Sequence, residues 1–226
     1  NLKNIKVCIV KNLKKDPDGQ KVLMALSGGV DSLVAATLIK EAVGSNLHCV
    51  FINTGLLRNY DIKDLNEVVK SVGFKNLNIV NAQNQFMKVL KGIADPEEKR
   101  GQIAKVYFSI LEEEAKRIGN IAYLAQGTIY PDRVESAQTS KHADKIKSHH
   151  NVTLPHGLKL KIIEPLSDFY KDEVRKIGRI LKIPQEFLDR HPFPGPGLAI
   201  RILGEVTEDR LEILRQVDEI FISELK

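Results

Sequence analysis

The strongest constraint on the fold is an alternation of short apolar runs with longer stretches of helical spacing. The runs rich in Val, Ile and Leu are residues 22–26, 47–54, 77–82, 121–128 and 159–165. The stretches that separate them, such as DSLVAATLIKEAV and QIAKVYFSILEEEAKRI, repeat apolar residues at helical intervals. Strands that alternate with helices form βαβ units with parallel strands and right-handed crossovers. We therefore expect an α/β fold, a doubly wound and mostly parallel sheet covered by helices on both faces.

The same spacing predicts where the helices lie and which segments depart from the pattern. Helices are expected over residues 31–43, 61–72, 83–93, 102–118, 170–182 and, with Thr207 as a cap, 207–226. Residues 130–157 are polar and lack apolar periodicity, and a loop of that length in a compact domain is usually functional or disordered. HPFPGPG, residues 191–197, is typical of a stiff connector, and the LAIRIL that follows it is interpreted as a strand.

Composition places the chain among ordinary globular proteins. It has 226 residues, of which 42% are hydrophobic and 28% charged, with 34 Lys and Arg against 29 Asp and Glu. This small positive excess fits a solvated lysine-rich surface or anionic ligands and does not require a nucleic acid. No apolar run is long enough to cross a bilayer and the N-terminus lacks a signal sequence, so we expect a cytoplasmic protein without a membrane partner. The chain opens on Asn1 and stops within a helical pattern, which suggests a fragment.

The two cysteines do not indicate a redox or metal site. Cys8 and Cys49 have the spacing of neither a zinc motif nor a disulfide framework. Cys49 lies inside an apolar run, so we expect a buried free thiol. Neither residue sits at a nucleophile elbow with a histidine partner, so the sequence contains no recognisable glutaminase centre.

The sequence SGGVDS, residues 27–32, lies between the first predicted strand and the first predicted helix. Ligands of open α/β sheets bind beyond the carboxyl ends of the strands, where free N–H groups and the helix dipole favour an anion. Gly28 and Gly29 remove the Cβ atoms that would keep phosphate away, and Ser27 and Ser32 add hydroxyl donors. An ionised Asp31 would instead cap the helix or help hold Mg²⁺. The spacing is neither Walker A nor G-x-G-x-x-G, and the alternative is a tight turn without a ligand.

SGGVDS resembles the PP-loop of the N-type ATP pyrophosphatases, which hold the β- and γ-phosphates of ATP and cleave between the α- and β-phosphates. Five further segments resemble the GMP synthetase family in the same order: DPEEKR, LAQGTIYPDRVES, IKSHHN, EPLSDFYKDEVRKIGR and RHPFPGPGLAIRILGEV. The resemblance runs from about residue 20 to the C-terminus. It implies a ligase of the adenine nucleotide alpha hydrolase-like fold that converts XMP, ATP and ammonia to GMP, AMP and pyrophosphate through an adenylyl-XMP intermediate, with Mg²⁺.

The resemblance also implies a set of site residues. Those that would bind the nucleotide are Ser27, Gly28, Gly29, Val30, Asp31, Ser32, Ile52 and Gly127. Asp132 and Glu135 would be catalytic carboxylates that hold Mg²⁺, together with Asp31, or hold a lid; the alternative is that they cap the segment that follows. Gly127 would let the nucleotide approach the backbone, or would form a simple strand-end turn.

The polar segment before residue 152 would carry further functional groups. By resemblance, Lys147, His149, His150 and Asn151 belong to a lid that closes over ATP, with Lys147 and the two histidines catalytic and Asn151 at the substrate. Adjacent histidines on a loop could otherwise bind a metal or have no role, although a structural zinc site is improbable without nearby cysteines. Arg100 would contact XMP, and the alternative is an exposed helical arginine.

The sequence departs from the family pattern at one position, and the resemblance also implies how the domains and subunits are organised. Asn53 stands where the family usually has an aspartate, which puts that contact with ATP or Mg²⁺ in doubt. Residues 1–200 would form the ATP pyrophosphatase domain, and residues 201–226 the opening strand and helix of a small α+β dimerisation domain. We expect a homodimer through the C-terminal region and ammonia taken free or from a separate glutamine amidotransferase subunit. A tRNA-thiolating or NAD-forming pyrophosphatase and a non-catalytic ATP sensor are the alternatives.

Overall fold

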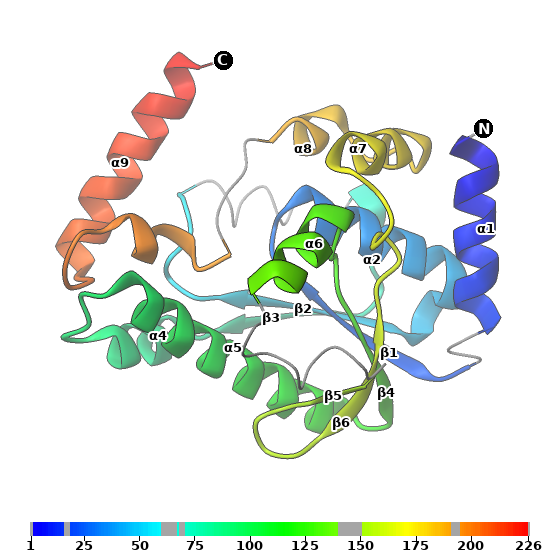
Figure 1. Ribbon diagram of the computed structural model, residues 1–226, viewed down its shortest axis with the longest axis horizontal. Helices are drawn as coiled ribbons and strands as arrows, with labels where there is room; N and C mark the ends of the chain where they lie inside the picture. Colours follow the sequence, from blue (N-terminus) through cyan, green and yellow to red (C-terminus); the bar gives the residue numbers. More distant parts are fainter. Residues whose placement is uncertain are drawn as a thin grey trace.

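A mixed six-stranded sheet with helices on both faces forms the centre of the molecule (Figure 1). The computed structural model describes residues 2–15, 19–59, 67, 71–139, 151–190 and 195–225. The strand order is β3-β2-β1-β4-β6-β5, in which all neighbours are parallel except β5, which is antiparallel to β6. Five parallel strands with covering helices confirm the predicted doubly wound α/β fold.

The elements have the following bounds. The strands are β1 Lys21–Leu26, β2 Leu47–Asn53, β3 Leu77–Asn81, β4 Ile121–Ala125, β5 Asn151–Thr153 and β6 Lys159–Ile163. The α-helices are α1 Leu2–Lys15, α2 Val30–Val43, α4 Gln83–Leu90, α5 Pro96–Ile118, α6 Tyr130–Thr139, α7 Lys171–Ile180, α8 Gln185–Leu188 and α9 Glu208–Glu224. Two 3₁₀ helices, η1 Gly44–Asn46 and η2 Gly197–Arg201, lie between these elements, and residues 67 and 71–72 are helical as well.

The alternation of side chains along β1 divides the core into two layers. Val22 and Met24 pack on one face with residues of α1, α2, α7 and α8. Leu23 points to the other face and packs with residues of α4, α5 and η2. All three side chains are fully buried, because both faces of a central parallel strand are covered by crossover helices. This packing holds the carboxyl end of β1 rigidly at one edge of the sheet.

Two sequence-based expectations are wrong. LAIRIL, residues 198–203, is not a strand, because its first four residues belong to η2, which follows the rigid Pro196. The fully buried Lys99 of α5 donates to the carbonyl oxygens of Ala199 and Ile202 at 3.2 and 2.7 Å, which stabilises that turn. The predicted long loop at 130–157 contains α6 at its start and β5 near its end. The three residues of β5 were too few to give a strand signal, and the predicted helix 61–72 lies mostly outside the described residues.

Helix boundaries were set by residues that the apolar pattern does not include. α5 begins six positions before the expected residue 102, because Asp95 accepts a hydrogen bond from the Glu98 N–H at 2.8 Å and Pro96 occupies the first turn. α1 was not anticipated, and it packs on the core through Ile9, Val10 and Leu13. α9 begins as predicted, with the Thr207 hydroxyl accepting from the Arg210 N–H. In the part of the chain that is described, no helix combines the length and apolar character needed for a membrane span.

Candidate nucleotide-binding site

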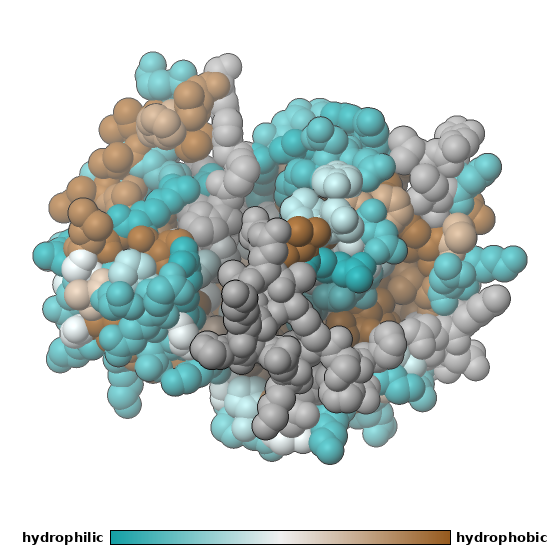
Figure 2. Space-filling view, viewed as in Figure 1, coloured by the Kyte–Doolittle hydropathy of each residue, from teal (hydrophilic) through white to brown (hydrophobic). Residues whose placement is uncertain are grey.

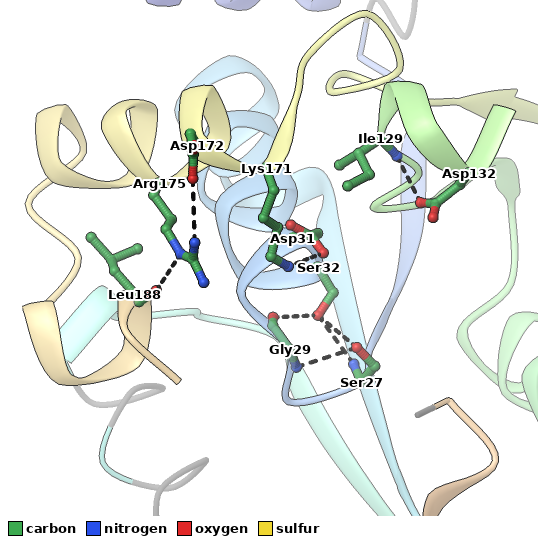
Figure 3. A network of polar contacts seen from close by, with 10 residues as sticks. All are labelled: Ser27, Gly29, Asp31, Ser32, Ile129, Asp132, Lys171, Asp172, Arg175 and Leu188. Atoms are coloured by element: carbon green, nitrogen blue, oxygen red, sulfur yellow. Dashed lines mark hydrogen bonds and ion pairs between the residues drawn. The ribbon is translucent and has the colours of Figure 1, made fainter. Parts of the chain in front are cut away.

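The loop between β1 and α2 is held in shape by its own serine hydroxyls (Figure 3). Ser32 Oγ accepts from the Ser27 N–H at 3.3 Å and donates to the Gly29 carbonyl at 2.9 Å. Ser27 Oγ lies 3.0 Å from Ser32 Oγ and accepts from the Gly29 N–H at 3.3 Å. The two hydroxyls therefore shape the loop, a role additional to the phosphate contacts expected from the sequence.

The first turn of α2 presents unpartnered main-chain donors. Gly29 is the N-cap residue, and no side chain caps the helix there. The first hydrogen bond of the helix runs from the Leu33 N–H to the Gly29 carbonyl, so among the described residues no acceptor satisfies the N–H groups of Val30, Asp31 and Ser32. Gly28 has a φ of 79°, a conformation that glycine adopts without strain. These donors and the helix dipole make the turn suited to an anion.

A cavity of about 300 Å³ adjoins this turn. It is lined by Ala25, Ser27, Gly29, Asp31 and Ser32 of the β1–α2 region, Tyr107, Phe108 and Leu111 of α5, Leu124, Ala125, Gln126, Gly127 and Thr128 at the end of β4, and Asp132 of α6. Burial raises the pKa of Tyr107 to about 12. The cavity thus has apolar and aromatic walls and adjoins the anion-binding first turn of α2, a combination that suits a nucleotide.

Gly127 permits the closest approach in the site. A Cβ atom at this position would lie 2.8 Å from both the N and the Cα of Ser32. From the sequence, this glycine is expected to let a nucleotide approach the backbone or to form a simple turn. In the structure the backbone that comes close is the start of α2 itself, and the approach of a nucleotide to Gly127, which also lines the cavity, stays a prediction. The glycine therefore lets the end of β4 pack directly on the anion-binding turn.

Asp31 does not cap α2, which corrects one of its two expected roles. Its Oδ2 lies 2.5 Å from Nζ of Lys171, the first residue of α7 (Figure 3). Its Oδ1 is buried and has no hydrogen-bond partner among the described residues. Nearby, Arg190 Nη1 donates to the Gly28 carbonyl at 3.1 Å. The sequence analysis missed Lys171 and Arg190, and the only signal was their position within segments that resemble the GMP synthetase family.

Asp132 lies in the first turn of α6, where it accepts a hydrogen bond from the N–H of Ile129. The distance from that nitrogen to Oδ2 is 3.0 Å, which matches the capping alternative for this oxygen. The side chain also lines the cavity, as Asp31 does. Glu135 lies in α6, but its side chain is outside the described residues.

The two aspartates fit a cation that is bound mainly by substrate. In the described part of the chain, no three His, Cys, Asp or Glu side chains are grouped as a metal site. Mg²⁺, however, usually takes one or two carboxylates together with substrate phosphates and water. The buried, unpartnered Oδ1 of Asp31 beside a cavity that Asp132 also lines matches that requirement.

Other predicted residues are not brought to this cavity. Arg100 is exposed on α5 and pairs with Glu97, and its predicted contact with XMP stays a prediction. Ile52 is 3% exposed and packs in the core under the sheet. Asn53 Oδ1 accepts from the Gly55 N–H at 3.1 Å, so it forms a local turn. Lys147, His149 and His150 lie outside the described residues; Asn151 begins β5, but its side chain is not described.

Comparison with known proteins agrees with this geometry. The NAD synthase family matches residues 1–106. A protein described as glutamine-hydrolysing GMP synthase from Thermotoga maritima is 50% identical over 218 residues, which are 96% of this chain and 43% of that protein. In fold, the chain resembles an NH₃-dependent NAD synthetase from Campylobacter jejuni, with a TM-score of 0.65, 15% identity and coverage of 100% and 88% of the two chains. It also resembles an NMN synthetase from Francisella tularensis, with a TM-score of 0.66, 16% identity and coverage of 96% and 93%.

The fold, the loop geometry and these similarities point to the same class of protein. The chain contains a PP-loop domain similar to those of NAD synthases and GMP synthases. Within that class, its sequence matches the ATP pyrophosphatase portion of GMP synthases, and it spans less than half the length of those relatives.

Proposed function

We propose that this chain is the ATP pyrophosphatase part of a GMP synthase, a C–N ligase that aminates XMP to GMP at the expense of ATP. The observation that carries the proposal is the turn at residues 28–32, where the N–H groups of residues 30–32 have no partner among the described residues and the turn adjoins a cavity of about 300 Å³. The 50% identity to GMP synthases over 96% of the chain supports the choice of substrate.

The proposed reaction has two steps. The 2-oxo oxygen of XMP attacks the α-phosphorus of ATP and the bond to the β-phosphate breaks, which releases pyrophosphate and forms adenylyl-XMP. Ammonia then adds to C2, loses a proton and displaces AMP. Catalysis by positioning and charge stabilisation suits the site, because a rigid turn of N–H donors needs no reorganisation as charge develops on pyrophosphate.

The described residues have distinct proposed roles. Val30, Asp31 and Ser32 donate main-chain hydrogen bonds to the leaving pyrophosphate, and Lys171 adds a positive charge beside it. Asp31 and Asp132 would hold Mg²⁺, which when bound would neutralise phosphate charge. The assignments of Arg100 and Asn151 to XMP, of Glu135 to catalysis, and of Lys147, His149 and His150 to closure over ATP remain predictions.

Assembly and cellular setting are proposed from the names of the relatives and from the surface of α9. The name of the relatives supports glutamine as the source of ammonia, through a glutaminase associated with this chain. A homodimer through residues 201–226 is supported by exposed apolar side chains on α9, namely Ile213, Val217, Ile220 and Phe221. Figure 2 shows this helix as an apolar surface at the left of the molecule. A cytoplasmic setting follows from the biosynthetic reaction.

The proposal is tested by following all products in one assay. The full-length protein is incubated with ATP, Mg²⁺, XMP and ammonium, and AMP, pyrophosphate and GMP are separated by chromatography. We expect the three products in equal amounts, and no GMP when XMP or ammonium is left out. Release of AMP that is independent of XMP would contradict the proposal, as would binding of ATP without turnover, the result expected of a sensor.

Amidation of deamido-NAD is the second candidate, favoured by the NAD synthase family match at residues 1–106. The fold neighbours are only 15–16% identical, which supports the fold alone. The same assay with deamido-NAD in place of XMP distinguishes the two functions, because only the correct acceptor gives stoichiometric AMP and pyrophosphate.

A further inference from the structure

The loop that follows β2, residues 54–58, is hydrogen-bonded to the C-terminal part of the chain. Three consecutive carbonyl oxygens of this loop accept hydrogen bonds from η2 and α9. The Leu198 N–H donates to the Leu56 oxygen at 2.8 Å. Arg215 donates through Nε to the Leu57 oxygen at 3.0 Å and through Nη2 to the Gly55 oxygen.

A buried carboxylate joins the same three segments. Asp218 of α9, whose side chain is 5% exposed, lies 2.7 Å from Arg201 Nη1 at the end of η2 and 3.3 Å from Arg58 Nε at the end of the loop. Asn59 Nδ2 adds a hydrogen bond to Glu219 Oε2 at 3.3 Å. A carboxylate removed from water between two guanidinium groups is held firmly only while both partners stay in place.

This loop lies at the same edge of the sheet as the anion-binding turn. β1 and β2 are parallel neighbours, and their register pairs Leu26 with Phe51, so both chains leave the sheet at its carboxyl edge. Ligands of open α/β sheets bind across that edge. Residues 54–58 do not line the cavity of about 300 Å³, so the loop is linked to the nucleotide site through the carboxyl edge that β2 shares with β1.

The two loops differ in what stabilises them. Ser27 and Ser32 hold the β1–α2 turn from within. Residues 54–57 have two local bonds among the described residues, from the Gly55 N–H to Asn53 Oδ1 and from the Leu56 N–H to Thr54 Oγ1. Their carbonyl oxygens depend on residues more than 140 positions later in the sequence.

We propose that Arg215 and Asp218 are positioning residues that hold residues 54–58 in the geometry that binds nucleotide, so that the placement of α9 sets the affinity for ATP. The proposal rests on the proposed function, in which the turn at 28–32 binds ATP. According to this proposal, α9 affects ATP affinity indirectly, through residues 54–58, and does not contact the nucleotide itself.

The test compares two arginines of the same helix in the full-length protein. Arg215→Met removes the donors to the loop, whereas Arg210→Met removes a guanidinium that donates to the Glu205 oxygen at 2.8 Å and does not contact the loop. We expect Arg215→Met to weaken ATP binding, measured by calorimetry with Mg²⁺, by at least about tenfold, because two charge-assisted bonds are lost. Arg210→Met should stay within about twofold.

Three further measurements separate positioning from general stability. Arg215→Met should raise KM for ATP and leave kcat nearly unchanged, because bound ATP restores the loop. Arg215→Lys, which keeps one donor, should recover part of the affinity. Amide exchange at residues 54–58 should quicken in Arg215→Met and in the isosteric Asp218→Asn, with exchange in β1 unchanged.

The outcomes are decisive in each direction. If Arg215→Met and Asp218→Asn bind ATP as the wild type does, or if Arg210→Met weakens binding equally, the proposal is overturned. If Arg215→Met does not fold, Asp218→Asn alone decides it by the same affinity and exchange measurements. Failure of the wild type to bind ATP would overturn the proposed function and with it the claim on affinity, whereas the exchange data would still report the hydrogen bonds to the loop.

Discussion

Lys171 Nζ lies 2.5 Å from Asp31 Oδ2, although the two residues are 140 positions apart in the sequence. The contact joins the first turn of α2 to the first turn of α7 beside the unpartnered N–H groups. In the proposed reaction, this contact would place a cation beside the leaving pyrophosphate.

Lys171→Met should therefore impair chemistry. We expect the rate of XMP-dependent AMP release to fall by about 100-fold, because a preorganised charge at the developing anion is lost and Asp31 is left unpaired. Lys176→Met, on the exposed side of the same helix, is the matched control and should retain full activity. Equal rates in both variants would rule out a role for Lys171 in charge stabilisation.

Gly127→Ala should separate the end of β4 from α2. The added Cβ would lie 2.8 Å from Ser32 backbone atoms, so we expect a loss of about 1–3 kcal/mol in the free energy of unfolding and weaker ATP binding. Gly101→Ala, within α5 and with no atom near the added Cβ, should instead stabilise by about 0.5–1 kcal/mol. Urea unfolding of both variants gives the comparison, and a neutral Gly127→Ala would refute the close contact.

Glu112 should make the free energy of unfolding depend on pH under acidic conditions. Its buried carboxylate accepts from the N–H groups of His156 and Leu158 at 2.6 and 3.1 Å and pairs with Lys116 at 3.0 Å. Burial raises its pKa, but the hydrogen bonds from His156, Lys116 and Leu158 outweigh that effect and hold the pKa below the ordinary 4.5. As the pH falls, the unfolded state is protonated first, so this stabilisation is complete above 4.5 and is lost on further acidification.

Denaturant midpoints measured from about pH 7 to about pH 3 test this dependence. Glu112→Gln should be less stable than the wild type near neutrality and should lose less stability on acidification. The exposed neighbour gives the control, because Glu113→Gln should follow the wild-type curve. If the denaturant midpoints of Glu112→Gln and the wild type fell equally on acidification, Glu112 would not be the source of the pH dependence.

The two cysteines should differ sharply in reactivity. Cys8 is exposed, whereas Cys49 is buried in β2, where desolvation raises the pKa of its thiol to about 12. Iodoacetamide should modify only Cys8 in the native protein and both residues in urea, as measured by mass spectrometry of peptides. Rapid native labelling of Cys49 would show that β2 is not packed as described.

Much of the fold was predictable from local patterns. The apolar runs that became β1, β2, β3, β4 and β6 and the helical spacing of α2 and α9 report the geometry of single elements. The errors fell where the pattern was short or absent: three residues of β5, and η2 after Pro196. Asp31 and Asp132 were predicted as site residues from their motifs, and the structure places both at one cavity, but it gives Asp132 a capping bond as well.

The sequence by itself determined that a glycine-rich turn follows the first strand of a doubly wound sheet, because alternation and spacing describe neighbours along the chain. Only the tertiary structure decided that Lys171 would pair with Asp31, that Gly127 would pack on Ser32, and that Arg215 would hold the loop after β2. Such contacts join segments far apart in sequence, and they depend on how the helices pack across the sheet. Local patterns carry no record of that packing.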